Sequence, residues 1–355
     1  MSALDDPATY QRLDRQDMRT TIRDLPRQCR DAWQGAQAFA LPADYGDVDR
    51  VLILGMGGSA IAGDLLRALA ALESPVPIFG HRRYDLPLLV DGRTLLIASS
   101  YSGNTEETLS AFQAALGGDA KKLVITTGGQ LLATARANGI PAFVFRYESQ
   151  PRAALGYSLM PLLAIAGKLG IIEEKSADVA QAIVVMEELL RRIGEDVPLA
   201  ENPAKQLATR LHGRLPVIYG AGLLTDVARR WKTGLNETSE MWAFFEELPE
   251  ANHNAIVGYA LPPDIAQAAF VVFLRASSLH PRVLLRYEYT RGALAEAGVE
   301  CETVEATGRS PLAHILSTVI LGDYVGLYLA LLNEVEPAPT AVIARLKERL
   351  AERPA

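Results

Sequence analysis

Cysteines and long apolar runs are scarce in this sequence of 355 residues, and basic residues are outnumbered by acidic ones. Cys29 and Cys301 are its two cysteines, and their wide separation argues against a disulfide scaffold or a cysteine-based metal site. The first 19 residues are charged and lack the apolar core of a signal peptide. The most apolar stretch, residues 310–332, is interrupted by His314 and Asp323, which favours a buried helix over a membrane span. We therefore expect a cytoplasmic protein that makes no membrane contact.

The charge balance argues against a nucleic-acid partner. The formal net charge is −7, and lysines and arginines are mixed with acidic residues, so no broad basic face is expected. A pocket with a few local donors can still bind an anion, whatever the net charge. The 49% hydrophobic and 22% charged residues are typical of a globular protein, and the length predicts two domains.

Strand and helix patterns alternate along most of the chain. An apolar run, a glycine-rich turn and a helical pattern follow one another from Arg50, and the same unit recurs from Thr94 and from Lys121. Residues 156–194 are continuously helical, and the alternation resumes at Leu215. This order predicts an α/β protein with two doubly wound domains, each a parallel sheet flanked by helices. We place the domains at residues 1–155 and 201–355, joined by a helical region at 156–200, with a tail helix closing the second.

The first glycine-rich loop has two interpretations. Gly55, Gly57 and Ala60 match the G-x-G-x-x-[GA] spacing of a dinucleotide loop, but a tight strand-to-helix turn can have the same spacing. A nicotinamide site also needs an acidic residue about twenty positions later to hold the ribose. The next strand instead ends PIFGHRR, where Arg82 or Arg83 could hold a 2′-phosphate. A nucleotide-dependent oxidoreductase therefore stays open as an alternative.

The second loop, SSYSGNTEET, is rich in hydroxyl groups and follows a predicted strand. Its hydroxyl residues are Ser99, Ser100, Ser102, Thr105 and Thr108. In doubly wound sheets ligands bind outside the carboxyl ends of strands, where helix N-termini attract anions. The alternative is ordinary turn chemistry, with Ser102 or Asn104 capping the next helix. Together with Ser59 in the adjacent loop, the cluster favours a compact phosphate monoester over an extended dinucleotide.

Segments along nearly the whole chain resemble the bifunctional phosphoglucose/phosphomannose isomerases, which are sugar isomerase (SIS) domain proteins of the phosphoglucose isomerase superfamily. They are GMGGSA at 55–60, SYSGNTEET at 100–108, QPRAALGYS at 150–158, LNETSEMWAFFEELPEANHNAIVGY at 235–259 and APTAVIARLKERL at 338–350. The resemblance implies two SIS-type domains and reversible isomerisation of glucose 6-phosphate, and of mannose 6-phosphate, with fructose 6-phosphate.

The resemblance also implies a role for each matching residue. The residues that it assigns to substrate binding are Gly57, Gly58, Ser59, Ser100, Ser102, Thr105 and Thr340, the four hydroxyls from Ser59 to Thr105 holding phosphate and Thr340 being linked to the mannose epimer. The residues that it assigns to catalysis are Glu237 as base, Arg152 on the enediolate, His253 in ring opening and Lys347 in closing the site. In similar enzymes the histidine comes from the partner subunit, which implies a homodimer.

Two departures from the family pattern affect this transfer of roles. The segment TSEMWAFFEE follows Glu237 where Asn-Ser-Lys is expected, so the surroundings of the base differ from the pattern. Ala60 stands where a glycine is usual.

The chemistry itself calls for these residue types. Aldose–ketose isomerisation moves a proton between two adjacent carbons, which one carboxylate can do, and a fixed cation stabilises the enediolate. Such a base works best where partial burial raises its pKa. Arginine suits the cation role because it keeps its charge and presents a rigid fork. Histidine suits acid/base work at the ring oxygen.

Each catalytic candidate also has a structural alternative. Arg152 could cap the preceding strand or pair with Glu148. His253 could be an ordinary loop histidine, and Lys347 a surface lysine. Glu237 could belong to a solvated acidic face with its acidic neighbours, which are Glu240, Glu246, Glu247 and Glu250.

The remaining histidines argue against a metal enzyme. His81, His212, His280 and His314 show no metal-ligand spacing, so we expect neither a metal nor any other cofactor. A non-catalytic sugar-phosphate sensor with the same hydroxyl loops is the other alternative, but it would not need Glu237, Arg152 and His253 together.

Overall fold

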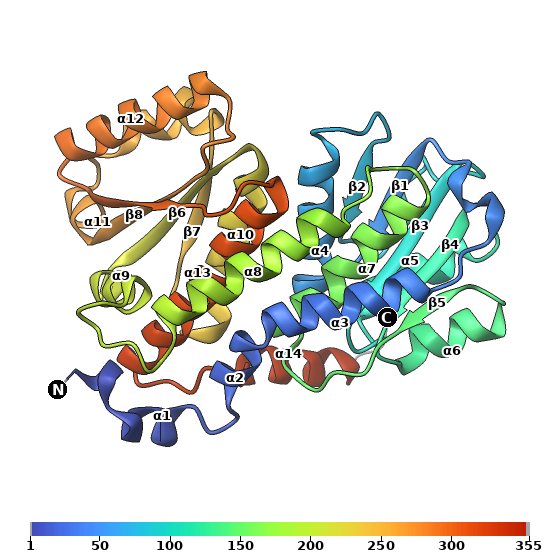
Figure 1. The fold of residues 1–355 in the computed structure, drawn as a ribbon, viewed down its shortest axis with the longest axis horizontal. Helices are drawn as coiled ribbons and strands as arrows, with labels where there is room; N and C mark the ends of the chain where they lie inside the picture. The colour runs from blue at the N-terminus through green and yellow to red at the C-terminus, as the bar shows by residue number, and fades with distance from the viewer. Residues whose placement is uncertain (1, 353–355) are drawn as a thin grey trace.

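A computed structural model describes residues 2–352, which form two parallel β-sheets flanked by helices (Figure 1). The first sheet has the strand order β2-β1-β3-β4-β5, and the second has the order β7-β6-β8-β9. The strands are β1 Arg50–Leu54, β2 Ile78–His81, β3 Thr94–Ser100, β4 Lys121–Thr126, β5 Ala142–Val144, β6 Leu215–Ala221, β7 Phe244–Leu248, β8 Ala269–Arg275 and β9 Glu300–Glu305. All their pairings are parallel, which confirms the predicted fold class.

Helices connect and cover these strands. The α-helices are α1 Pro7–Leu13, α2 Met18–Arg23, α3 Leu25–Ala38, α4 Gly57–Ala70, α5 Glu106–Ala115, α6 Gly129–Ala137, α7 Leu155–Lys168, α8 Ser176–Ile193, α9 Pro203–Leu211, α10 Thr225–Thr238, α11 Pro263–Ala268, α12 Pro281–Glu296, α13 Pro311–Leu332 and α14 Ala341–Ala351. The 3₁₀-helices are η1 Ala3–Asp5, η2 Ala43–Gly46, η3 Pro151–Ala153, η4 Gly222–Leu224, η5 Glu250–His253 and η6 Ala255–Gly258.

The inner strands β1 and β3 of the first sheet are buried on both faces, and most of their residues are apolar. Leu52 and Leu96 belong to a core shared with Phe112 of α5, whereas Ile53 and Ile97 belong to the core on the other face. Alternate residues of a strand point to opposite faces, so the continuous apolar run VLIL supplies both cores. The sheet therefore holds the carboxyl ends of β1 and β3 rigidly at one edge.

The two sheets share one topology. In the first sheet β1 lies between β2 and β3, and in the second sheet β6 lies between β7 and β8. On the far side of β3 lies β4, and on the far side of β8 lies β9. The corresponding strands β1 and β6 are each followed by a glycine-rich turn, in the segments VLILGMGG and PVIYGAG. The shared order is what an internal duplication would produce.

The apolar stretch at 310–332 forms α13, which lies between the two sheets (Figure 1). This helix is long and apolar enough to cross a membrane, but 78% of its most apolar window is buried inside the protein. Its two polar interruptions have partners. The ring of His314 contacts Ser278 and the Gly308 carbonyl, and Asp323 accepts hydrogen bonds from Arg230. The prediction of a buried core helix is confirmed.

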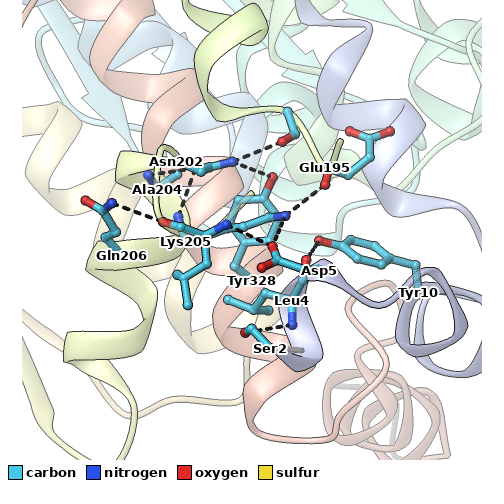
Figure 2. A network of polar contacts seen from close by, with 12 residues as sticks. Ser2, Leu4, Asp5, Tyr10, Glu195, Asn202, Ala204, Lys205, Gln206 and Tyr328 are labelled. Atoms are coloured by element: carbon cyan, nitrogen blue, oxygen red, sulfur yellow. Dashed lines mark hydrogen bonds and ion pairs between the residues drawn. The ribbon is translucent and has the colours of Figure 1, made fainter. Parts of the chain in front are cut away.

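The N-terminal segment is anchored to the second half of the chain through a buried lysine. The Lys205 side chain has no exposed surface, and its Nζ donates to Asp5 Oδ1 at 3.0 Å and to the Glu195 carbonyl at 2.8 Å. The same Nζ lies 5.5 Å from the centre of the Tyr328 ring on α13. Figure 2 shows these contacts converging on Lys205. Residues 2–13 are thus anchored against α9 and α13.

Several element predictions differ from the structure in detail. The region 156–194, which the sequence pattern predicted as continuously helical, is divided into α7 and α8. The pattern also missed β5 and β7, which are edge strands of their sheets. An edge strand is buried against a single neighbour, so β7 has one buried residue, Leu248, while its other residues are exposed or half-buried, and it lacks a continuous apolar run. The exact domain boundaries stay a prediction.

Candidate active site

The two loops predicted to bind phosphate lie side by side. β1 and β3 are hydrogen-bonded neighbours, so their parallel carboxyl ends place residues 55–60 next to residues 101–106. The buried Ser59 hydroxyl accepts a hydrogen bond of 3.2 Å from the Tyr101 amide and joins the loops. The sequence prediction that Ser59 lies near the second loop is confirmed.

The hydroxyls of the second loop are organised by contacts with one another. Ser100 Oγ lies 2.9 Å from Thr105 Oγ1 and accepts a 3.1 Å hydrogen bond from the Gly103 amide. Ser102 is exposed, and its Oγ accepts a 3.2 Å hydrogen bond from the Asn104 amide. The loop thus presents polar groups from the buried strand end to the surface.

Both helices that begin at these loops lack a side-chain cap. Neither Met56 before α4 nor Thr105 before α5 makes a capping hydrogen bond. Capping of α5 by Ser102 or Asn104 is therefore wrong, because Asn104 Oδ1 accepts instead from the Gln130 amide at the start of α6. The first amides of a helix need a partner and carry partial positive charge, so the two helix starts favour an anion.

Glycines allow the first loop to approach Arg152. Gly57 has a φ of +50°, which favours glycine. A Cβ at Gly58 would stand 2.8 Å from the Pro151 carbonyl oxygen and 3.2 Å from the Arg152 Cα. The start of α4 therefore packs directly on η3, and the predicted anion loop adjoins the predicted catalytic arginine.

A small cavity that is partly open to solvent extends from this junction. Its walls come from α2, α4, η3, α10 and α13, so both halves of the chain contribute. The lining residues are Met18, Ile22, Gly57, Gly58, Ile61, Arg152, Ala153, Arg230, Thr233, Gly234, Glu237, Thr238, Gly322, Asp323 and Gly326.

Arg152 and Glu237 face each other in this cavity. Arg152 Nη1 lies 3.7 Å from Glu237 Oε2, and the two side chains are 8% and 29% exposed. Burial lowers the pKa of Arg152 from its ordinary value, while the nearby Glu237 and Asp323 carboxylates raise it in part. An arginine remains charged under such conditions. The alternative pairing of Arg152 with Glu148 is wrong, and Glu237 is not part of a solvated acidic face.

Helix α10 positions Glu237 through its spacing. Arg230, Thr233, Gly234 and Glu237 recur at intervals of three and four residues, which places them on one face of the helix toward the cavity. Gly234 leaves room in front of this face, and Glu237 lies in its last turn. A carboxylate beside a buried guanidinium can exchange a proton with a bound ligand while the cation stabilises developing negative charge.

Sequence reasoning missed a second buried ion pair next to this site. Arg230 Nη2 donates to both Asp323 carboxylate oxygens, at 3.0 and 2.7 Å, and to the Arg152 carbonyl at 3.2 Å. Burial raises the pKa of Asp323 from its ordinary value, and Arg230 opposes this. The sequence did indicate such a pair, because a carboxylate inside the apolar run 310–332 requires a buried partner.

Seven predicted residues lie outside the cavity lining. They are the hydroxyl residues of the two loops, Ser59, Ser100, Ser102 and Thr105, together with His253, Thr340 and Lys347. His253 is exposed on η5, and Lys347 is exposed on α14, whose residues 341–350 are all exposed. Thr340 is half-buried at the start of α14. It lies two residues beyond Ala338, whose carbonyl accepts a hydrogen bond from Arg152, so the segment before α14 reaches the site.

Other side chains proposed for alternative chemistry have internal roles. Arg82, considered for a 2′-phosphate, pairs with the buried Asp64. Among residues 2–352 no group of three or more histidine, cysteine or acidic residues could hold a metal ion. Cys29 and Cys301 are both free.

Comparison with known proteins defines the class of protein first. The family described as bacterial phospho-glucose isomerase C-terminal SIS domain matches residues 200–350. Two structures from Thermus thermophilus share the fold, both at 20% identity. A hypothetical protein has a TM-score of 0.71, covering 95% of this chain and 91% of its own. A glucose-6-phosphate isomerase-like protein has a TM-score of 0.66, covering 97% and 100%. The chain therefore has the α/β fold of these structures, and its residues 200–350 belong to the SIS class.

Sequence relatives then specify the family. A bifunctional phosphoglucose/phosphomannose isomerase of Caldicellulosiruptor bescii is 40% identical over 333 residues, covering 94% of this chain and 98% of the relative. The corresponding protein of Aquifex aeolicus is 34% identical over 301 residues, with coverage of 84% and 90%. The chain belongs to the family of bifunctional phosphoglucose/phosphomannose isomerases. The family resemblance seen in the sequence is confirmed.

Proposed function

We propose that this protein interconverts glucose 6-phosphate, and also mannose 6-phosphate, with fructose 6-phosphate. Family membership supports an isomerase. The observation that carries the proposal is the pairing of Glu237 with the buried Arg152 at 3.7 Å in a cavity adjoining the hydroxyl loops. A protein that only binds sugar phosphate has no need of a carboxylate beside a buried cation.

In the proposed mechanism Glu237 carries one proton between neighbouring carbons. With the aldose open, the carboxylate takes the proton from the second carbon, and the electron pair forms the carbon–carbon double bond of an enediolate while the carbonyl oxygen becomes anionic. Arg152 stabilises that oxygen. The protonated Glu237 returns its proton to the first carbon, the double-bond electrons form the new C–H bond, and the ketose carbonyl forms at the second carbon as its hydroxyl proton passes to the first oxygen.

The phosphate group of the substrate would lie between the two loops. Ser59, Ser100, Ser102 and Thr105 supply hydroxyls, and the uncapped starts of α4 and α5 supply amides, with Gly57 and Gly58 allowing close approach. The close packing of Gly58 on η3 supports a substrate that spans from these loops to Arg152. This arrangement suits a phosphate monoester attached to a short carbon chain.

The ring-opening residue would come from a second copy of the chain. His253 is exposed and does not line the cavity of its own subunit. Exposed apolar side chains follow it closely in the sequence, with Val257 at 88% and Leu261 at 75% exposure. Large exposed apolar groups mark association surfaces. These features support a homodimer in which His253 reaches the partner's cavity.

The C-terminal tail would complete the site. Lys347 lies on the exposed helix α14, and Thr340 lies where the tail leaves the Arg152 contacts. We propose that Lys347 closes the site and that Thr340 allows the bound enediolate to rotate, so that either face of the second carbon is reprotonated. Rotation is required because the glucose and mannose phosphates share one enediolate.

We further propose that catalysis needs no cofactor, that the domains are residues 1–155 and 201–355, and that the protein is cytoplasmic.

The test is a coupled assay on chelator-treated protein supplied with fructose 6-phosphate, in which both aldose phosphates are monitored. We expect both products, with turnover unaffected by the chelator. Binding of fructose 6-phosphate without either product would instead support a sugar-phosphate sensor. Titration with reduced nicotinamide cofactor, followed by fluorescence, would detect an oxidoreductase.

A further inference from the structure

Thr238, which directly follows the proposed base, contacts the guanidinium of Arg152. We propose that Thr238 is a positioning residue that turns the free edge of Arg152 toward the enediolate. The inference rests on the proposed function, because it assumes that Arg152 stabilises the charge formed beside Glu237.

Most of the donors of Arg152 are already occupied by the protein. Nε donates to Thr238 Oγ1 at 3.1 Å, and Nη2 donates to the carbonyls of Pro337 and Ala338 at 2.6 and 2.8 Å. An arginine side chain has five N–H donors, so the two on Nη1 remain. Nη1 makes no hydrogen bond to a described residue, and it is the nitrogen 3.7 Å from Glu237 Oε2. The unoccupied edge of the guanidinium is therefore the edge that faces the base.

Thr238 is needed because the two carbonyls cannot fix this orientation by themselves. Both bind the same nitrogen, Nη2, and a planar group held at one end can still tilt about that end. The bond from Nε to Thr238 is a second anchor at a different nitrogen, and two anchors define the plane of a rigid fork. Losing it would free Nη1 to move away from the reacting oxygen.

The threonine is itself held in place. It is 5% exposed and is the last residue of α10. A Cβ built on Gly326 of α13 would lie 3.8 Å from Thr238 Cβ and 3.9 Å from its Cγ2, so the methyl group packs next to this glycine while Oγ1 faces Arg152. A β-branched side chain with both branches in contact has one favoured rotamer. The acceptor is thus fixed relative to Glu237 on the same helix.

The experiment compares Thr238→Val with Thr238→Ser. Valine keeps the shape and removes the acceptor, so kcat for fructose 6-phosphate should fall about 10- to 100-fold, the range for one hydrogen bond to a charged group. KM should change by less than about threefold, because the lost orientation matters mainly in the transition state. Serine keeps the acceptor and should retain kcat within about threefold of the native enzyme. Thr209→Val is the matched control, because within residues 2–352 that exposed hydroxyl bonds only to the Lys205 carbonyl of its own helix.

The outcomes separate this inference from the proposed function. Absence of isomerisation by the native protein contradicts the proposed function. An active native enzyme whose Thr238→Val variant keeps native kcat overturns the inference alone. Equal losses for valine and serine also overturn it, because serine keeps the acceptor and its loss would show that the hydroxyl by itself does not hold Arg152 in place. A crystal structure of Thr238→Val decides independently of activity: Nη1 should turn away from Glu237, and an unchanged guanidinium contradicts the inference.

Discussion

At the scale of single residues, the site depends on keeping a charged arginine in a nearly closed environment. Arg152 is 8% exposed, and a buried charge is costly unless it is paired and hydrogen-bonded. Three of its donors have protein acceptors, and the neighbouring Glu237 supplies opposite charge. The arrangement leaves a guanidinium edge and a carboxylate on the same side of the cavity, where a ligand can contact both.

Replacing the base should abolish turnover without preventing binding. Glu237→Gln keeps the shape of the side chain but cannot accept a proton from carbon, so kcat should fall at least about 100-fold. Binding of a phosphorylated sugar acid, which resembles the enediolate, should persist because the hydroxyl loops and Arg152 remain. Calorimetry of that ligand and the coupled assay measure the two quantities.

The matched control for this variant is Glu240→Gln, an exposed glutamate just beyond the end of α10. It should behave as the native enzyme does. In heavy water the native enzyme should place deuterium on the second carbon of the aldose, and Glu237→Gln should not. Retention of more than about a tenth of native turnover by Glu237→Gln contradicts its role as the base.

At the scale of elements, α10 and α14 contrast in how they contribute to the site. α10 is packed against the second sheet and α13 and presents one face to the cavity. α14 is amphipathic, yet residues 341–350 are exposed, including the apolar Val342 at 70% and Leu346 at 56%. Core packing fixes α10 in place, whereas the apolar face of α14 is left uncovered by the described residues of its own chain.

Lys347→Ala should separate stability from activity. Because Lys347 is exposed, the free energy of unfolding should change by less than about 0.5 kcal/mol. If the lysine closes the site, kcat/KM for fructose 6-phosphate should fall about 10- to 100-fold through loss of a charge-assisted hydrogen bond. Arg349→Ala, which removes a cation from the same helix, is the control and should be active. Native kcat/KM in Lys347→Ala would identify an ordinary surface lysine.

At the scale of the whole molecule, the cavity exists because both halves of the chain meet. Arg152 follows the first sheet, Glu237 belongs to the second half, and Asp323 lies on the helix between the sheets (Figure 1). Met18 and Ile22, near the N-terminus, complete the wall. The N-terminal residues 2–13, which precede Met18 and Ile22 in the chain, are anchored through the contact of Asp5 with Lys205 (Figure 2).

Removing the charge of Asp5 should weaken its contact with Lys205 and lower the free energy of unfolding. Burial raises the pKa of Asp5, but hydrogen bonds from Lys205 and the Leu199 amide outweigh it, so the folded-state pKa lies below the ordinary value of 3.8. A carboxylate with a lowered pKa stabilises the fold above about pH 3.8, and this contribution is lost as the pH falls through its folded-state value. Asp5→Asn should therefore lose about 1.5 to 3 kcal/mol of unfolding free energy at pH 7.

Denaturant titrations at several pH values test this expectation. The difference between Asp5→Asn and the native protein should shrink as the pH falls below about 3.8, because the native carboxyl is then protonated too. Asp196→Asn, an exposed site in the same region, should match the native protein. A difference that stays constant at low pH contradicts the role given to the Asp5 charge.

Mixing two inactive variants tests the shared active site. Glu237→Gln and His253→Gln should each be nearly inactive as homodimers. If His253 acts in the partner's cavity, a mixed dimer has one site with native Glu237 and native His253 and one site lacking both. Unfolding and refolding an equal mixture should restore about a quarter of native activity, because half of the dimers are mixed and each has one intact site.

No recovery, with mixed dimers demonstrated by differently tagged subunits, would place His253 in the site of its own subunit. A monomer in analytical ultracentrifugation would contradict the dimer itself.

The sequence by itself determined the class of fold and the family. Buried parallel strands need apolar side chains on both faces, so β1, β3 and β4 were visible as short apolar runs followed by glycine or hydroxyl-rich turns. Neighbouring parallel strands end at one edge, so the pairing of Ser59 with the second loop also followed from local pattern. These features depend on residues close together in the chain.

Only the tertiary structure decided what surrounds the proposed base. The acceptors of Arg152 are Thr238, Pro337 and Ala338, which are 86, 185 and 186 residues away from it, and no local pattern connects such distant positions. The Arg230–Asp323 pair joins two helices in the same way. The edge strand β7 was not predicted because only its last residue is buried. Burial and hydrogen-bond satisfaction are properties of the packed molecule, so the partners of a buried charge become identifiable only when the helices that supply them have met.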